Sequence, residues 1–228
     1  MSAGAVTAQE ISLKSALSGG RRLVGYKIAL LDTGAQTRLG ATGPVWGQLT
    51  DDMALIDGSE FDLSAVASAK AEAELVFQLG ADLASPGSTE ADVLAATCAL
   101  HVGIEIPAVP LGDEAATDVE TFTRKNAFAS AYVLGRAVTE FRRIDMSLIG
   151  AIVDVDGNVV GSGCGARVLG SPARAVAWLA NRLALRGKQL DAGTLVFTGA
   201  LAEPVTLATG HRVSVEIAHL GRAAIRVV

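Results

Sequence analysis

The sequence predicts an α+β fold with a largely β core and a few peripheral helices. Two observations carry this prediction, and the composition adds that the chain can form a large core. Expected strands and helices are mixed without the regular strand–helix–strand rhythm of a doubly wound parallel sheet. The second half is rich in strands and includes a hairpin signal at Asp156-Gly157, because a type I′ turn needs positive φ. Hydrophobic residues make up 50% of the chain, enough for a substantial buried core.

The N-terminal half is expected to begin with a short helix. Thr7-Ala8-Gln9-Glu10 has the pattern of a capping box, and Gly19-Gly20 would end the helix. Residues 23–31 then form an apolar run typical of a buried strand, interrupted by Lys27. The other elements expected here are a short helix over 32–42, loop and short strand over 43–63, a strand over 70–79, a helix over 89–100, a strand over 102–109 and a loop over 110–125.

The C-terminal half is expected to hold one clear helix among strands. Ser171-Pro172 supplies a cap and a first-turn proline, and Gly187 ends the apolar periodicity. The glycine-rich segment 161–165 is interpreted as a tight turn, because no lysine follows as in a phosphate-binding loop. The expected strands are 131–134, 148–155, 158–162, 195–198, 212–217 and 223–228.

Composition and charge narrow the functional class. With 228 residues, the chain could form one large domain or two small ones. A net charge of -5 and no basic stripe argue against nucleic-acid binding. No signal peptide and no apolar run of about 20 residues is visible, so we expect no membrane span. Two widely spaced cysteines, Cys98 and Cys164, are interpreted as free thiols, and we expect a cytoplasmic protein.

Two glutamates lie two residues apart on the strand expected over 70–79. Glu72 and Glu74 should therefore point to the same face, where their charges repel unless a positive group lies between them. The plain alternative is an outward-facing charged strand surface. Ala71, Ala73 and Leu75 supply an apolar opposite face, which favours a strand with one specialised side.

Glu105 is the third carboxylate of interest, since apolar residues flank it on both sides. A buried carboxylate there would cost several kcal/mol unless paired, protonated or bound to metal. The alternative is a half-exposed strand face. Three carboxylates with water would form an oxygen-only shell that suits Mg²⁺ or Mn²⁺ better than zinc. Spacing in the sequence does not show whether the three side chains converge.

Lys27 is also unusual, because it lies within an apolar run that is expected to be buried. A buried lysine usually pairs with a carboxylate or binds an anionic ligand. The alternative is a side chain that reaches solvent from a strand edge. Thr198-Gly199-Ala200 ends an apolar strand, where ligand contacts are common.

These residues occur in order with several other short motifs: Gly25-Tyr26-Lys27-Ile28, Ala71-Glu72-Ala73-Glu74, Ile104-Glu105, Leu169-Gly170-Ser171-Pro172, Ala177-Trp178-Leu179-Ala180, Ala192-Gly193 and Thr198-Gly199-Ala200-Leu201. In this ordered set, from about residue 23 to the C-terminus, the chain resembles the 2-keto-4-pentenoate hydratase and 4-oxalocrotonate decarboxylase family of the fumarylacetoacetate hydrolase superfamily.

The resemblance implies a mixed β-roll with surrounding helices. We expect residues 1–228 to form a single catalytic domain with a short N-terminal helical segment, in a homo-oligomer. The resemblance implies that Glu72, Glu74 and Glu105 bind Mg²⁺ or Mn²⁺. It implies that a 2-oxo acid chelates this metal through its carboxylate and 2-oxo oxygen, and that a catalytic Lys27 lies beside the metal. The expected substrate-binding residues are Trp46, Lys125, Thr198, Gly199 and Ala200.

The chain departs from the family pattern around the substrate. Val45-Trp46-Gly47 occupies the position where hydratases usually have Asp-Phe-Gly. Arg124-Lys125-Asn126 occupies the position of the usual Ala-Asp-Asn. Pro107-Ala108-Val109 replaces a Ser-Arg pair, and Gly170-Ser171-Pro172 replaces Gly-His-Pro. The metal-binding half of the implied site is retained, whereas the half that selects substrate and moves protons has changed.

The leading functional hypothesis is a hydratase-like, metal-dependent lyase that acts on a 2-oxo or 2-hydroxydienoic acid. The alternatives are decarboxylation of a 4-oxalocrotonate-like acid, an isomerase or cyclase with an atypical substrate, and a degenerate partner subunit without activity.

Overall fold

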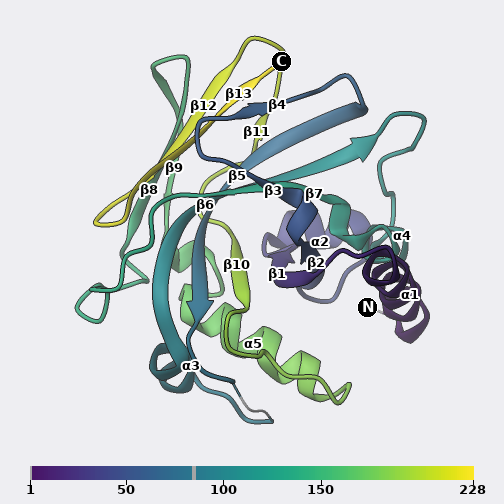
Figure 1. Cartoon of the computed structure of the whole chain (residues 1–228), viewed down its shortest axis with the longest axis vertical. Helices are drawn as coiled ribbons and strands as arrows, with labels where there is room; N and C mark the ends of the chain where they lie inside the picture. Colours follow the sequence, from purple (N-terminus) through teal and green to yellow (C-terminus); the bar gives the residue numbers. More distant parts are fainter. Residues whose placement is uncertain (1, 84–85) are drawn as a thin grey trace.

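The computed structural model describes residues 2–83 and 86–228, which form two β-sheets with helices around them (Figure 1). In this part of the chain, one sheet has eight strands in the order β2-β1-β10-β5-β6-β7-β3, with β11 paired to β5. The other has five strands in the order β4-β13-β12-β8-β9. The α+β prediction is confirmed, since parallel and antiparallel pairs are mixed and no regular strand–helix alternation occurs.

The eight-stranded sheet contains β1 Leu23–Ala29, β2 Val45–Thr50, β3 Ala54–Leu55, β5 Val66–Leu79, β6 Thr97–Pro110, β7 Ala129–Leu134, β10 Leu195–Ala200 and β11 Val205–Thr206. The five-stranded sheet contains β4 Glu60–Phe61, β8 Gly150–Val155, β9 Asn158–Cys164, β12 Arg212–Ile217 and β13 Gly221–Val227. The helices are α1 Ala3–Ser18, α2 Thr33–Leu39, α3 Glu90–Ala96, α4 Val119–Arg124 and α5 Pro172–Ala184, with 3₁₀ turns η1 Asp51–Met53, η2 Asn126–Phe128 and η3 Gly165–Arg167.

Two long antiparallel strands, β5 and β6, cross the molecule and organise the site (Figure 1). Their register places Glu72 opposite Glu105 and Glu74 opposite Gly103. Residues opposite each other on paired strands project to the same face of the sheet. A Cβ on Gly103 would lie 2.5 Å from a methyl carbon of Val76, so only glycine fits there. Pairing alone therefore brings the three carboxylates to one face.

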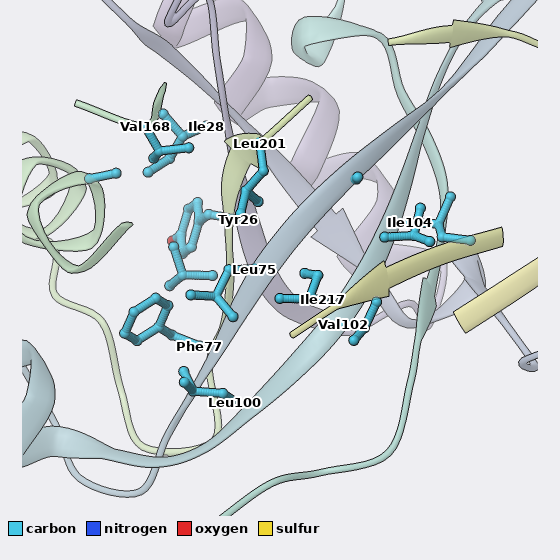
Figure 2. Close-up of a cluster of buried hydrophobic side chains, with 14 of the residues drawn as sticks. Tyr26, Ile28, Leu75, Phe77, Leu100, Val102, Ile104, Val168, Leu201 and Ile217 are labelled. Atoms are coloured by element: carbon cyan, nitrogen blue, oxygen red, sulfur yellow. The ribbon is translucent and has the colours of Figure 1, made fainter. Parts of the chain in front are cut away.

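The hydrophobic core covers the opposite face of these strands. Figure 2 shows Leu75 and Phe77 of β5 with Leu100, Val102 and Ile104 of β6, all fully buried. Ile217 of β12 lies beside them, because the five-stranded sheet packs against β5 and β6. Side chains alternate along a strand, so the residues between these apolar positions face away from the core.

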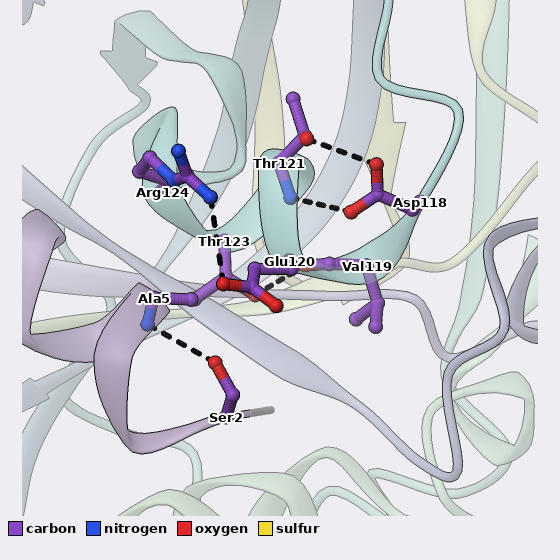
Figure 3. A network of polar contacts seen from close by, with 8 residues as sticks. All are labelled: Ser2, Ala5, Asp118, Val119, Glu120, Thr121, Thr123 and Arg124. Carbon is purple, nitrogen blue, oxygen red and sulfur yellow. Dashed lines mark hydrogen bonds and ion pairs between the residues drawn. The ribbon is translucent and has the colours of Figure 1, made fainter.

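The N-terminal helix begins before the predicted capping box. α1 starts at Ala3, and the Ser2 hydroxyl accepts a hydrogen bond from the Ala5 N–H at 3.1 Å (Figure 3). The expected start at Thr7 was wrong, since Thr7 lies within the helix. The predicted end is confirmed, since the helix ends at Ser18 with Gly19 as its C-cap.

A short helix lies in the segment expected to be loop over 110–125. α4 begins after Asp118, whose carboxylate accepts hydrogen bonds from the backbone N–H and hydroxyl of Thr121 (Figure 3). It packs against α1. The sequence signal was Asp118 itself, a favourable N-cap residue.

The predicted helix over 89–100 is too long. α3 ends at Ala96, and β6 begins directly at Thr97. Residues that continue the helical pattern instead pair with β5, where Ala99 lies opposite Gln78. Sheet pairing therefore overrides local helix preference at this boundary.

The glycine-rich segment 161–165 is not the tight turn that the sequence suggested. It completes β9 and enters η3. A Cβ on Gly163 would lie 1.8 Å from the Leu201 carbonyl oxygen, and one on Gly165 would lie 1.7 Å from the Met146 carbonyl oxygen. These glycines serve close backbone packing. Among the described residues, no helix is long and apolar enough to cross a membrane.

Candidate metal centre and substrate pocket

The three glutamates converge. One carboxylate oxygen from each of Glu72, Glu74 and Glu105 lies within 4.8 Å of the corresponding oxygens of the other two. Glu74 and Glu105 are fully buried, whereas Glu72 is partly exposed. The side chains thus form a cluster that opens toward solvent on the Glu72 side.

Hydrogen bonds from the protein reach only some of the carboxylate oxygens in this cluster. The Gly199 N–H donates to Glu74 Oε2 at 2.5 Å. Glu74 Oε1 and Glu105 Oε1 are buried and accept no hydrogen bond from any described residue. Buried carboxylate oxygens without partners are costly. An oxygen-only donor set of this kind fits Mg²⁺ or Mn²⁺.

Lys27 balances only part of the charge. Its Nζ lies 3.0 Å from Glu105 Oε2, and the side chain is almost fully buried. Burial alone would lower the pKa of the ammonium, but the nearby carboxylates of Glu105, Glu72 and Glu74 raise it overall. Lys27 therefore stays charged, and three carboxylates against one ammonium leave room for a divalent cation.

The carboxylates hold protons unusually tightly in the absence of a cation. Burial raises the pKa of Glu105 to about 7, although Lys27 opposes the shift. Burial also raises the pKa of Glu74 well above its usual value, and the charges of Glu72 and Glu105 raise it further. Such clustering of shifted groups at a cavity is typical of functional sites.

A cavity of about 430 Å³ opens above the cluster, with Lys27 and Glu72 in its lining. Its size is in the range of small-molecule sites. The walls are mostly apolar and include Ile28, Leu31, Pro107, Val109, Phe122 and Phe128. The arrangement can hold a small acid with its carbon chain against apolar side chains and its polar end at the glutamates.

The predicted segment Thr198-Gly199-Ala200 lies against the cluster. Ala200 lines the cavity. Gly199 has φ +101°, a conformation that favours glycine, and its N–H binds Glu74. The Thr198 hydroxyl donates to the Leu75 carbonyl at 2.8 Å and is fully buried, so it supports the site from behind.

Trp46 and Lys125 do not line the described cavity. Trp46 is buried and packs edge-to-face on Trp178, with ring centroids 6.1 Å apart. Lys125 pairs with Asp113 and lies 5.6 Å from the centroid of the Phe128 ring, which does line the cavity.

A left-handed turn that the sequence did not reveal shapes one wall. Asn126, Ala127 and Phe128 all have positive φ, at 56°, 52° and 55°. The Asn126 side chain accepts hydrogen bonds from the Gln48 N–H at 2.7 Å and from Gln9 Nε2 at 3.0 Å. Its amide donates to the Gln48 carbonyl. This buried network stabilises a strained backbone and places Phe128 at the cavity.

Sequence comparison identifies the family. A model of the fumarylacetoacetate (FAA) hydrolase C-terminal domain matches residues 46–228. The chain belongs to this family. The expected mixed β-roll is thereby confirmed, and the glutamate cluster lies inside the matched region.

Similar proteins of this family are named as hydratases or as decarboxylases. The TodF product hydratase of Pseudomonas putida is 37% identical over 221 residues, which cover 95% of this chain and 81% of that protein. The 2-keto-4-pentenoate hydratase of Paraburkholderia xenovorans is 38% identical over 202 residues, covering 89% and 75%. A solved structure of 4-oxalocrotonate decarboxylase from Pseudomonas putida G7, complexed with magnesium and adipate, has a TM-score of 0.92 at 30% identity and covers 98% of this chain and 85% of that one.

Proposed function

We propose that the protein is a divalent-metal-dependent lyase, hydratase-like, that acts on a 2-oxo or 2-hydroxydienoic acid. The observation that carries this proposal is the buried glutamate cluster at an apolar cavity, with two unpartnered carboxylate oxygens and one buried ammonium. The names of the similar hydratases support it.

In this proposal Glu72, Glu74 and Glu105 hold Mg²⁺ or Mn²⁺. When bound, the cation would polarise the 2-oxo group and stabilise the enolate form of the substrate. The protein's own groups orient the acid. Gly199 fixes Glu74 through its N–H, and the Lys27 ammonium fixes Glu105.

Lys27 is the proposed catalytic residue, because its charged Nζ lies at the junction of the cluster and the cavity. There it can bind the substrate carboxylate or enolate oxygen. The apolar walls would hold the carbon chain and reduce contact with water. Ala200 lines the cavity next to Gly199, and we assign Gly199, Trp46, Thr198 and Lys125 a part in substrate binding through the segments that they support.

Turnover of two substrates tests this function. With Mg²⁺, the protein should hydrate 2-hydroxypenta-2,4-dienoate, measured as loss of diene absorbance and identified by NMR, and EDTA should stop the reaction. Lys27→Met should lower kcat at least about 100-fold, in the range of lost acid–base and electrostatic groups, while the circular dichroism spectrum is retained. An equally active Lys27→Met variant would leave Lys27 a structural role only.

Decarboxylation is the second candidate, because the solved structure at TM-score 0.92 is of a decarboxylase. Release of CO₂ from 4-oxalocrotonate at a higher kcat/KM than hydration of the dienoate would favour it.

We further propose that residues 1–228 act as one catalytic domain in a cytoplasmic homo-oligomer. Two free cysteines are consistent with a reducing compartment. Ile152 of β8 and Val159 and Val160 of the edge strand β9 are exposed apolar side chains on one sheet, as a subunit contact would require. Light scattering of the purified protein measures the assembly, and a monomer would contradict this part.

A further inference from the structure

One buried polar side chain of α1 reaches the eight-stranded sheet. Gln9 is only 1% exposed, although much of the helix faces solvent. Its Nε2 donates to the Trp46 carbonyl oxygen at 2.8 Å and to Asn126 Oδ1 at 3.0 Å. α1 also packs on α4, the helix that precedes Asn126 (Figure 1). Gln9 therefore joins three segments that are far apart in the sequence: α1, β2 and η2.

Only a hydrogen-bond donor fits between the two partners of Gln9. The Asn126 amide binds the Gln48 backbone through both of its ends, accepting the N–H at 2.7 Å and donating to the carbonyl at 2.8 Å. The Asn126 oxygen that faces Gln9 is therefore an acceptor, as is the Trp46 carbonyl. Gln9 Oε1 is left buried without a partner among the described residues, which is unfavourable. An apolar residue would avoid that cost, so the two hydrogen bonds are what a glutamine adds at this position.

The groups that Gln9 holds lie against Gly47, and Gly47 lies against Lys27. The Trp46 carbonyl belongs to the peptide bond that leads into Gly47, and strand pairing sets Gly47 opposite Lys27. A Cβ on Gly47 would lie 2.6 Å from the Asn126 carbonyl oxygen and 3.3 Å from Lys27 Cε. Gly47 is therefore packed between η2 and the lysine side chain, and a shift of its peptide bond would reach the lysine directly.

This packing matters because few hydrogen bonds hold the Lys27 ammonium. Nζ donates to Glu105 Oε2 at 3.0 Å and forms no other hydrogen bond with the described residues. Its remaining N–H groups can therefore bind the substrate acid. An ammonium on a flexible four-carbon stem takes its position from the groups that enclose the stem. The contact with Gly47 thus helps to fix where the charge lies.

We propose that Gln9 is a positioning residue for Lys27, which it reaches through the Trp46–Gly47 peptide bond. This inference rests on the proposed function, in which the Lys27 ammonium binds the carboxylate or enolate oxygen of the substrate. Without the Gln9 donor, the peptide bond would shift and the ammonium would leave its place beside the acid. Misplacement of a catalytic group by about 1 Å costs up to about 100-fold in rate.

The variant Gln9→Met tests the inference, since methionine keeps the length of the side chain and removes both the donor and the unpaired oxygen. Exchange of the C3 protons of 2-oxobutyrate into deuterated water, at saturating Mg²⁺ and substrate, measures the effect by NMR. We expect kcat to fall about tenfold, within the range for a misplaced group. The same substitution in the Lys27→Met protein should lower kcat no further, because Gln9 acts through the lysine. Ser2→Ala, which removes the N-cap of the same helix, is the control and should keep the wild-type kcat.

A spectroscopic readout of Lys27 does not depend on turnover. The chain has five lysines, so labelling with ¹³Cε-lysine gives few NMR signals, and the signal lost in Lys27→Met belongs to Lys27. We expect this signal to shift in Gln9→Met and to remain unshifted in Ser2→Ala. An unshifted signal in Gln9→Met, or an equal fold-loss of kcat with and without the lysine, would overturn this inference and leave the proposed function standing. Absence of Mg²⁺-dependent exchange in the wild type would overturn both.

Discussion

At the residue scale, the surroundings of the Glu105 side chain are those of a ligand-binding group. Its side chain is fully buried, one oxygen binds Lys27 and the other has no partner among the described residues. Such an oxygen lowers the stability of the fold unless a ligand binds it, so its presence indicates a ligand. The charge and the geometry of that ligand follow from the two other carboxylates beside it.

Replacement of Glu105 by glutamine should remove most of the metal affinity. Glu105→Gln keeps the volume and removes one anionic oxygen, so we expect Mn²⁺ to bind more than about 100-fold more weakly, since even second-shell changes cost 10–100-fold. Titration by electron paramagnetic resonance measures free Mn²⁺. Glu216→Gln, at an exposed position on β12, is the control. Unchanged binding in the Glu105 variant would mean that the metal lies elsewhere.

The stability of the metal-free protein should depend on pH through the same residue. Burial raises the pKa of Glu105 from 4.5 to about 7, so between these values the folded protein binds a proton that the unfolded chain has lost. The metal-free fold should therefore lose stability as pH rises through this window. Mg²⁺ binds the charged carboxylates, so its stabilising effect should grow over the same range.

Thermal unfolding at pH 5.5, 6.5 and 7.5, with EDTA and with Mg²⁺, measures both trends. The difference between wild type and Glu105→Gln isolates this group from the exposed carboxylates. Parallel curves for the two proteins in EDTA would show that Glu105 does not titrate in this window.

At the scale of elements, pairing between strands positions the site. Parallel pairing of β1 with β10 sets Lys27 opposite Phe197, and antiparallel pairing of β5 with β6 sets Glu72 opposite Glu105. The side-chain alternation of β5 was readable from sequence, and so was the shared face of Glu72 and Glu74. The register that adds Glu105 was not, because it depends on partners more than thirty residues apart in the chain.

Gly25 shows how closely β1 approaches its neighbour. A Cβ there would lie 2.2 Å from the Leu195 carbonyl oxygen, which is backbone and cannot move aside. Gly25→Ala should destabilise the fold by about 1–3 kcal/mol, the usual range for overpacking, and should weaken metal binding by displacing Lys27. Gly43→Ala, where a Cβ would meet nothing within 4 Å, is the control. Urea unfolding gives the stability of both variants and Mn²⁺ titration gives their metal affinity; equal stabilities would contradict the packing account.

Over the whole molecule, the sequence predicted the fold class, most strands and the three glutamates that the structure brings together. Much of the prediction of the β-roll and of the glutamate cluster depended on the resemblance to a known family. The sequence did not reveal the left-handed turn at Asn126–Phe128, since positive φ in three non-glycine residues is set by the buried contacts of Gln9 and Gln48 and not by local preference.

The central claim is that this fold binds a 2-oxo acid at a metal and makes its enolate accessible. Exchange of the C3 protons of a simple 2-oxo acid, such as 2-oxobutyrate, into deuterated water needs only that step and one base, whatever the final reaction. We predict Mg²⁺-dependent exchange, followed by NMR, that EDTA abolishes and that Glu74→Gln strongly reduces. Exchange no faster than with Mg²⁺ alone, across several 2-oxo acids, would contradict the enzyme assignment and favour a partner subunit without activity.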